Sequence, residues 1–303
     1  MSDLHIGGLL DFKALEYTVY KTKQLLATIK PSKRVLVVLG DIVEGSNIHK
    51  YQHLVTHPSQ QAKYAAYVVK WLVDELAVNK VIIIPGNHDL RSHEGKDLFS
   101  LILGHLRNLN VNVEVRKEGD IITIGNKKVL LRHEIGYSSG GYAGGLTPKL
   151  LTNALVYLRQ TSADVVIAGH YHVFAITPEI ILLPSFQWCS DPKYWYRGAV
   201  IVTDDWSIIP VITRNMTDYN NQEGVDELED WLYNIRKRYR YQNNGTIRLC
   251  RKFSGYKQTR VLPVQLYNRI KMLIEAGYPL NSIARELNVD RSLPRLVKYG
   301  HPC

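Results

Sequence analysis

Hydrophobic positions in the first two thirds of the chain follow two alternating patterns. Short runs of β-branched and aliphatic residues are typical of buried strands, and they occur at Val35–Leu39, Val81–Ile84, Val129–Leu131, Val165–Ala168, Ile180–Leu183 and Ala199–Val202. Between several of these runs, apolar residues repeat with the period of an amphipathic helix, at Phe12–Ile29, Ala62–Ala77, Asp97–Leu109 and Thr147–Thr161. This alternation predicts an α/β fold in which helices flank layers of β-sheet. A turn at Gly125-Asn126 predicts a hairpin of Ile121–Ile124 and Val129–Leu131.

The last third of the chain has a different pattern. A helix is predicted at Asp226–Tyr239, where acidic residues at the start and basic residues at the end suit the helix dipole. Residues 241–260 are polar and basic, and we interpret them as a linker or extended arm. Three further helices follow, at Leu262–Gly277, Ser282–Leu287 and Asp290–Lys298. We therefore expect a domain over 1–215, a basic helix and linker over 216–260, and a small all-α module over 261–303.

The net charge of +10 is concentrated at one end. Residues 1–230 carry slightly more acids than bases, whereas residues 231–303 contain only three acids, Glu275, Glu286 and Asp290, among many Lys and Arg. A near-neutral domain followed by a strongly basic one indicates contact with a polyanion. A solvated tail that only keeps the protein soluble is the alternative.

Several classes of protein are disfavoured by composition. No apolar run approaches the roughly 18 residues that cross a bilayer, and the N-terminus lacks the pattern of a signal peptide. The three cysteines, Cys189, Cys250 and Cys303, are too few and too far apart for a disulfide framework. We therefore expect a cytoplasmic protein.

Chemistry-bearing residues gather in five short segments, four of which follow a predicted strand. The segments are Asp3-Leu4-His5, Gly40-Asp41-Ile42-Val43-Glu44, Gly86-Asn87-His88-Asp89, His133 and Gly169-His170-Tyr171-His172. In layered α/β domains, sites form beyond the carboxyl ends of the strands. Imidazole, carboxylate and amide donors together suit Mn, Fe, Zn or Ni. Because the donors outnumber the needs of one ion, the pattern favours two ions, a common arrangement for cleaving phosphate esters.

These segments, in this order, resemble the calcineurin-like metallophosphoesterase family over about residues 1–205. The resemblance implies that Asp3, His5 and His172 hold one ion, that Asn87, His133 and His170 hold the other, and that Asp41 bridges them. It also implies a metal-bridging hydroxide as nucleophile and two divalent ions, with Mn²⁺ our expectation among the four metals. His88 and Asp89 would be catalytic: His88 would face the phosphate, and Asp89 would orient His88 and keep it protonated. Glu44 would support the site from behind.

One departure from the family pattern concerns the N-terminus. A buried apolar strand normally precedes the first motif, whereas only Met1 and Ser2 precede Asp3 here. We expect either a start that lies upstream of Met1 or a missing strand, and in both cases a poorly supported first ion.

The basic end of the chain resembles a helix-turn-helix of the resolvase or transposase type. The resemblance is carried by residues 282–293, Ser-Ile-Ala-Arg-Glu-Leu-Asn-Val-Asp-Arg-Ser-Leu, and it implies that Arg291, Ser292 and Arg295 face a major groove. A plain helical cap or a dimerisation module is the alternative. Upstream, cations alternate with aromatic residues, which suits phosphate contact and base stacking; the cations are Arg236, Lys237, Arg238 and Arg240.

The hypothesis that follows is a two-metal nuclease that hydrolyses DNA phosphodiesters, with its basic C-terminal region binding DNA. One alternative is a phosphatase acting on a small or protein phosphoester. The other is a non-catalytic DNA-binding or replication accessory subunit. Besides DNA, we expect as partner either a second copy of the chain or a replication or repair protein, and no membrane.

Overall fold

The computed structural model describes residues 1–45, 54–55, 57–90, 92–93, 96–136, 146–190, 196–220, 222–244, 246–253, 256–275, 277–287, 289–299 and 301–302, with only the backbone described over 240–259. The chain forms two compact units, Met1–Ile235 and Arg236–Cys303. Helix α5 (Gln222–Asn244) starts in the first unit and ends in the second.

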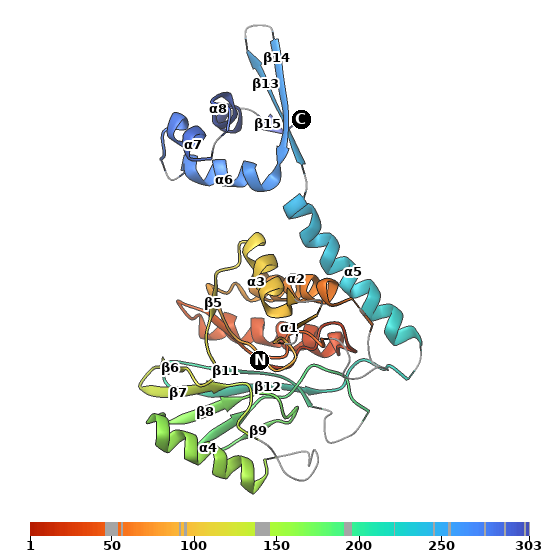
Figure 1. Ribbon diagram of the computed structural model, residues 1–303, viewed down its shortest axis with the longest axis vertical. Coiled ribbons are helices and arrows are strands. Elements are labelled where there is room, and N and C mark those ends of the chain that lie inside the picture. The colour runs from red at the N-terminus through yellow and green to blue at the C-terminus, as the bar shows by residue number, and fades with distance from the viewer. Residues whose placement is uncertain are drawn as a thin grey trace. The chain divides into compact units, whose positions relative to one another are not determined.

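The first unit contains a parallel sheet in the order β1-β2-β5. These strands are β1 (Val35–Leu39), β2 (Lys80–Ile84) and β5 (Val113–Val115). Three helices pack beside this sheet (Figure 1), namely α1 (Phe12–Ile29), α2 (Pro58–Leu76) and α3 (Leu98–Asn108). Two very short strands, β3 (Ser92–His93) and β4 (Lys96–Asp97), precede α3.

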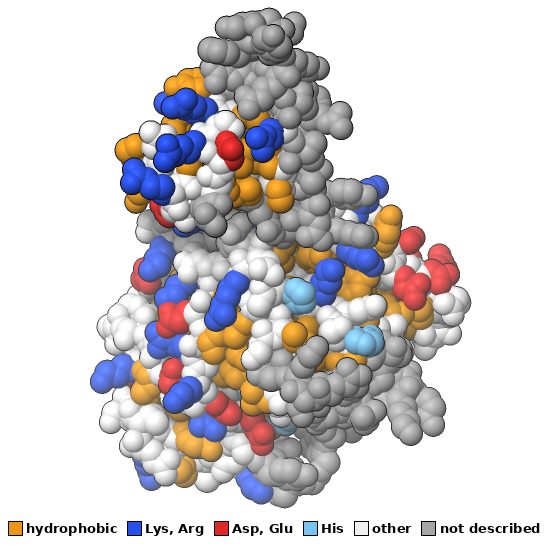
Figure 2. Space-filling model, turned by 45° about the horizontal axis from the view of Figure 1, so that its top comes forward, with side chains coloured by type: hydrophobic (Ala, Val, Ile, Leu, Met, Phe, Trp, Pro, Cys, Tyr) orange, Lys and Arg blue, Asp and Glu red, His pale blue; other side chains and the backbone are white. Residues whose placement is uncertain are grey.

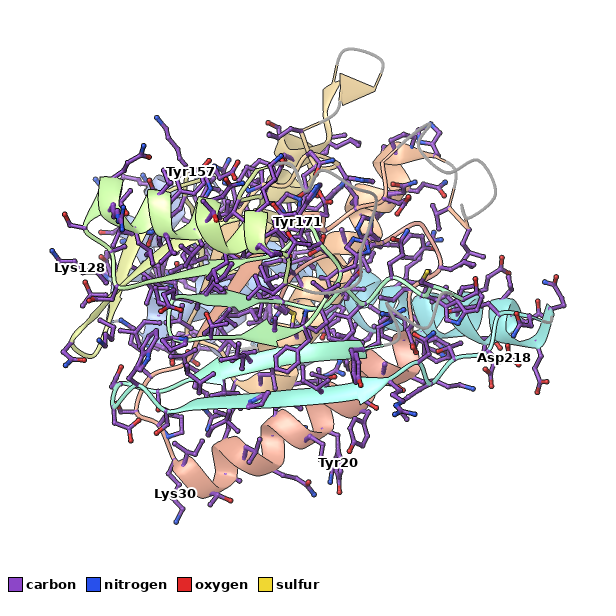
Figure 3. All side chains as sticks on the ribbon, turned by 90° about the horizontal axis from the view of Figure 1, so that it is seen from below. Tyr20, Lys30, Lys128, Tyr157, Tyr171 and Asp218 are labelled. Atoms are coloured by element: carbon purple, nitrogen blue, oxygen red, sulfur yellow. The ribbon has the colours of Figure 1, made fainter. Side chains whose placement is uncertain are left out.

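A second sheet, in the order β6-β7-β8-β10-β9, lies against the first. Its strands are β6 (Ile121–Ile124), β7 (Lys127–Arg132), β8 (Val165–Ala168), β9 (Ala175–Ile176) and β10 (Ile180–Leu182). Helix α4 (Pro148–Thr161) covers one face, and the other face packs on Leu39 and Ile84 of the first sheet. Figure 3 shows α4 and α1 on opposite sides of the strands. The expected layered α/β fold is therefore confirmed, with the hairpin now β6–β7.

The antiparallel pair β11 (Tyr196–Val202) and β12 (Ile208–Arg214) packs on α1 and leads into α5. The buried carboxylate of Asp11, the N-cap of α1, holds this connection. It accepts hydrogen bonds from the backbone amides of Met216 (2.9 Å) and Thr217 (3.1 Å). Further along, Trp231 of α5 donates from Nε1 to Glu16 of α1 at 2.8 Å. The first half of α5 is thus part of the first unit, beyond the expected boundary at 215.

The N-terminal segment has a firm support, contrary to our expectation. Its backbone runs beside β1 and the loop after it: the amide of Asp3 donates to Gly40 (3.1 Å), and that of His5 donates to Asp41 (2.9 Å). On its other side, the amide of Phe186 donates to the carbonyl of Asp3 at 3.0 Å. The expectation of poor support for this segment is wrong, because backbone hydrogen bonds hold it on both sides.

The second unit is not all-α, so that part of the prediction is wrong. Residues expected to be a linker form a long antiparallel hairpin of β13 (Thr246–Phe253) and β14 (Tyr256–Pro263), joined at its edge by β15 (His301–Pro302). The three expected helices are present as α6 (Val264–Glu275), α7 (Leu280–Glu286) and α8 (Ser292–Tyr299). They share a small core that includes Ile270, Ile283 and Leu296.

Among the described helices of both units, none combines the length and apolar character needed to cross a membrane.

Candidate metal centre

Five chain segments bring the predicted ligands together at one edge of the two sheets. Asp41 follows β1, Asn87 and His88 follow β2, His133 follows β7, and the two histidines of Gly169–His172 follow β8. Because β1, β2, β7 and β8 each end at this edge, residues far apart in sequence become neighbours. The amide of His170, for example, donates to Asp3 Oδ2 at 2.9 Å across 167 positions.

Asp41 lies at the centre of the cluster and is buried. Its Oδ2 atom is 3.2 Å from His133 Nε2 and 3.8 Å from His5 Nε2, so one oxygen faces histidines of both predicted sites. Its Oδ1 atom accepts the backbone amide of His88 at 2.9 Å, which fixes the carboxylate in place.

On one side of Asp41, three donor atoms face one another. His5 Nε2 is 3.2 Å from His172 Nε2 and 3.8 Å from Asp3 Oδ1, and Asp3 Oδ1 is 3.4 Å from His172 Nε2. Asp3 Oδ1 is fully buried and accepts no hydrogen bond from any described residue. A buried, unsatisfied carboxylate oxygen aimed at two imidazole nitrogens is the arrangement expected of a cation site.

On the other side, a second group surrounds His133 Nε2. This nitrogen is 3.0 Å from Asn87 Oδ1 and 3.3 Å from His170 Nδ1, in addition to its contact with Asp41. Donor atoms of Asp41, His133 and His170 lie within 4.8 Å of one another, as do those of Asp3, His5 and His172. A further group of His5, Glu44 and His88 satisfies the same distance limit. The predicted ligands themselves fall into two adjacent groups with Asp41 between them, a set that fits two divalent ions.

Hydrogen bonds behind the rings fix which nitrogen faces the cluster. His133 Nδ1–H donates to the carbonyl of Leu39 at 2.8 Å, which leaves Nε2 free to bind a cation. His5 Nδ1 lies 2.7 Å from Glu44 Oε2, and the same oxygen accepts Gln187 Nε2 at 3.0 Å. Such partners orient a metal-binding histidine and raise its basicity. Glu44 thus supports the site as expected, whereas Gln187 lies in no recognisable motif.

Two glycines of the motifs are required because neighbouring atoms lie too close to leave room for a side chain. A Cβ on Gly86 would lie 2.2 Å from Asp41 Oδ1, and one on Gly169 would lie 1.8 Å from Ser2 Oγ and 2.7 Å from Asp3 Oδ2. Several expected ligands also adopt positive φ angles, which non-glycine residues rarely do, namely Asp3, His5, Asp41, His170 and His172. Strain of this kind concentrates at functional sites, where surrounding structure holds it in place.

Asp89 has a different role from the one we predicted. Its buried carboxylate accepts the backbone amides of Ile42 (2.9 Å), Val43 (3.1 Å) and Gly86 (3.0 Å), and so joins the loops after β1 and β2. The His88 ring is oriented instead by the carbonyl of Glu44, which accepts Nδ1–H at 2.6 Å. His88 Nε2 then faces Asp41 Oδ2 at 3.8 Å.

The electrostatics are those of an acidic cluster that attracts cations. Burial disfavours charge on both Asp41 and His133, but their contact outweighs it, lowering the pKa of Asp41 to about 2 and raising that of His133 to about 10. The pKa of Asp3 is likewise held well below its usual range, despite burial, by His172 and His5. Burial and the neighbouring His5 lower the pKa of His88, although the charge of Asp41 acts in the opposite direction.

In the second unit, the candidate nucleic-acid residues are mostly exposed. Arg291, directly before α8, and Arg295 on α8 are exposed, whereas Leu293 and Leu296 of α8 face the core. Ser292 is half-buried, and its amide and hydroxyl both donate to Oδ1 of the exposed Asp290, at 2.7 and 2.5 Å, at the start of the helix. Lys298, which we did not predict, follows Arg291 and Arg295 at helical spacing and is exposed.

The other predicted cations lie at the end of α5. Lys237 and Arg238 are exposed, Arg236 is half-buried, and the side chain of Arg240 lies outside the described part of the chain. The Arg238 guanidinium is 5.5 Å from the ring centre of the buried Tyr239. Lys and Arg make up most of the charged side chains on the described surface of the second unit in Figure 2.

Comparison with known proteins bears on the first unit. No curated protein matches the sequence. Among solved structures, the chain is similar to nuclease MPE of Pseudomonas putida (20% identity, TM-score 0.33, 63% of this chain and 75% of that one). It is also similar to a hypothetical protein of Pyrococcus horikoshii OT3 (12% identity, TM-score 0.41, 78% of this chain and 94% of that one).

The family model of the calcineurin-like phosphoesterases matches residues 1–174, which is more than half of the chain and includes every predicted metal ligand. Members of this family are metal-dependent hydrolases of phosphoesters with a dinuclear centre. The two adjacent donor groups around Asp41 agree with that centre. The chain therefore belongs to the calcineurin-like phosphoesterase family.

Proposed function

We propose that this protein is a two-metal nuclease that hydrolyses phosphodiester bonds of DNA, with its second unit binding the nucleic acid. The observation that carries the proposal is the position of Asp41 Oδ2, which faces His133 on one side and His5 on the other. One carboxylate oxygen between two buried donor groups is suited to neutralise two neighbouring cations.

Asp3, His5 and His172 would hold the first ion, Asn87, His133 and His170 the second, and Asp41 both. When bound, the ions supply positive charge to the phosphoryl oxygens and lower the pKa of a coordinated water. The mixed nitrogen and oxygen donors suit Mn²⁺, with Fe, Zn and Ni also compatible. The contacts of Glu44 and Leu39 behind His5 and His133 fix the nitrogen that each ring presents.

His88 is the best candidate for proton transfer to the leaving group. Because its Nδ1–H is committed to the Glu44 carbonyl, only Nε2 is available to exchange a proton at the site. A phosphate dianion or monoanion beside the ring would raise the pKa of His88, which burial otherwise lowers. A protonated Nε2 would then donate to the departing oxygen as the phosphorus–oxygen bond breaks.

DNA is proposed as substrate because the charge of the chain is divided between its two units. The acids of the unit that carries the site slightly outnumber its bases, so the second unit holds all of the excess positive charge. Arg291, directly before α8, and Arg295 and Lys298 on it recur at intervals of four and three residues, and all three are exposed. Cations at this spacing on a short helix suit a row of phosphates or a groove edge.

The test uses full-length protein, Mn²⁺ and end-labelled linear DNA in single- and double-stranded form, with bis-p-nitrophenyl phosphate in parallel. His88→Ala is the site variant, and His105→Ala is its matched control because His105 lies on α3, outside the cluster. We expect Mn²⁺-dependent DNA cleavage that falls about 10²- to 10⁴-fold in His88→Ala and stays unchanged in the control.

The other outcomes point to the alternatives. Hydrolysis of the small ester with all DNA left intact would overturn the nuclease and favour a phosphatase. DNA binding without turnover of either substrate in Mn²⁺, Fe²⁺, Zn²⁺ or Ni²⁺ would overturn the enzyme and favour an accessory DNA-binding protein.

A further inference from the structure

The hairpin β13–β14 is unusual in its charge. It carries five cations, at Arg248, Arg251, Lys252, Lys257 and Arg260, and no acid. An ordinary exposed hairpin mixes both signs of charge, since opposite charges across the strands stabilise it. A segment of this length in which every charged residue is positive is therefore a candidate for an interaction with a polyanion.

The strand register of the hairpin places two of its cations directly opposite each other. Lys252 is paired directly with Lys257. The next pair, Phe253 with Tyr256, is the last one before the turn. Like charges directly opposite each other on an antiparallel pair destabilise it. The register therefore places two like charges opposite each other near the tip of a hairpin whose two strands contain no acid.

The acids of the second unit do not compensate the hairpin. Only three are present, and each has a partner in the helical part. Glu275 pairs with Lys271 at 3.8 Å and Glu286 pairs with Arg269 at 3.9 Å, while Asp290 caps α8 through Ser292. Against five cations on the hairpin and ten elsewhere in the unit, these three acids can offset only a small part of the positive charge.

The hairpin and α8 are parts of one body. Leu262 at the end of β14 shares a core with Leu293 and Leu296 of α8. The pKa of Asp290 is lowered, mainly by its hydrogen bonds with Ser292 and to a smaller extent by the charge of Arg260 on β14. The exposed Arg260 and the start of α8 are therefore close enough to act on the same ligand.

We propose that the β13–β14 hairpin is a second nucleic-acid-binding element, a basic arm that contacts the phosphate backbone of the same duplex DNA as α8. This inference rests on the proposed function and extends it from a single helix to a two-part interface. A duplex is favoured over other polyanions because its major groove admits either an α-helix or a two-stranded β-ribbon, the two kinds of element that this unit combines. Lys252 and Lys257 would neutralise phosphates near the tip of the arm.

The experiment measures the salt dependence of DNA binding by the full chain. A fluorescein-labelled duplex of about 25 base pairs is titrated by anisotropy at several NaCl concentrations, without divalent metal so that no cleavage occurs. The test variant is Lys252→Gln/Lys257→Gln. The matched control is Lys30→Gln/Lys128→Gln, which removes the same charge from exposed positions of the first unit (Figure 3).

Each phosphate contact contributes about 0.9 to the slope of log K against log [salt]. Loss of two contacts should make the slope about 1.8 less steep and weaken binding roughly 10- to 60-fold at 0.1 M salt. The control should keep the wild-type slope. A third variant, Lys252→Glu, places opposite charges across the pair, so it should stabilise the hairpin and still weaken DNA binding.

The outcomes separate the arm from the proposed function. If Arg291→Gln/Arg295→Gln weakens binding while both hairpin variants keep the wild-type slope, the arm is overturned and the DNA-binding unit stands. If the wild-type chain binds no duplex, the DNA part of the proposed function fails, and the arm fails with it. Equal losses in the hairpin and control variants would also overturn the arm, because they would reflect net charge alone.

Discussion

Replacing Glu44 should weaken the binding of one metal ion and spare the other. The carboxylate is buried, and its Oε2 lies 2.7 Å from His5 Nδ1 and accepts Gln187 Nε2 at 3.0 Å. Glu44→Ala removes the acceptor that holds the His5 ring with Nε2 toward Asp3 and His172. His133, on the other side of Asp41, is held by the Leu39 carbonyl and keeps its support.

The size of the effect follows from the kind of contact that is lost. Removing a hydrogen-bond partner behind a metal-binding histidine typically costs 10- to 100-fold in metal affinity, which corresponds to about 1.4–2.7 kcal/mol. Glu44→Gln keeps an acceptor and loses only the charge, so its loss should be smaller, about tenfold or less. Glu118→Gln serves as control, because Glu118 is exposed and lies outside the cluster, where it pairs with Arg132 at 3.1 Å and accepts the backbone amide of Glu134 at 3.2 Å.

The assay is calorimetric titration of metal-free protein with Mn²⁺, checked by the electron paramagnetic resonance signal of free Mn²⁺. Wild type and control should bind two equivalents, and Glu44→Ala should bind one of them 10- to 100-fold more weakly. Two equivalents of wild-type affinity in Glu44→Ala would refute the reasoning, provided that thermal unfolding shows a folded variant. Equal weakening of both equivalents would also refute it.

Three further predictions follow from the same structure. Gly169→Ala places a methyl group 1.8 Å from Ser2 Oγ and 2.7 Å from Asp3 Oδ2. It should therefore destabilise the fold by about 1–3 kcal/mol and weaken Mn²⁺ binding. An unchanged melting temperature and an unchanged Kd for Mn²⁺ would contradict this prediction. A chain that ends at residue 215 lacks four buried side chains, Leu228, Trp231, Leu232 and Ile235. Burial of each stabilises the fold by about 1.5–3 kcal/mol, so this chain should be unfolded. A chain that ends at residue 235 should show a cooperative melt by circular dichroism. Because the pKa of metal-free His133 is about 10, an incoming ion must displace its proton, and the Mn²⁺ Kd should rise about tenfold for each pH unit lowered between 9 and 7. In the metal-free protein the same contact stabilises the fold below pH 6.5 and loses this effect as the pH rises through about 10, a trend that urea denaturation at pH 6 and pH 10 would detect.

The strands formed by continuous aliphatic runs were the most predictable part of the fold. β1 and β8 match their predicted bounds, since continuous aliphatic runs leave no other interpretation. β12 was missed because Pro210 argues against a strand interior. The β13–β14 hairpin was missed because cations interrupt its apolar alternation, so its sequence looks like a solvated linker.

The candidate site was predictable as a set of residues and less so as a set of contacts. Polar residues directly after strand ends had to meet at one edge of the sheets, and the structure brings all seven predicted ligands together there. The orientation of His88 was not predictable, because it depends on the carbonyl of Glu44 and not on its neighbour Asp89. Backbone acceptors and an isolated Gln187 leave no pattern in the sequence.

The contact between Asp3 and His170 spans 167 positions, and this span sets the order of events during synthesis. At about 5–20 residues per second, Asp3 leaves the ribosome roughly 10 to 30 seconds before the second half of the cluster has been made. During that interval the nascent chain offers a cation only incomplete sets of ligands. Metal loading is therefore a late step, which follows closure of the whole domain and depends on the cell's free metal at that moment.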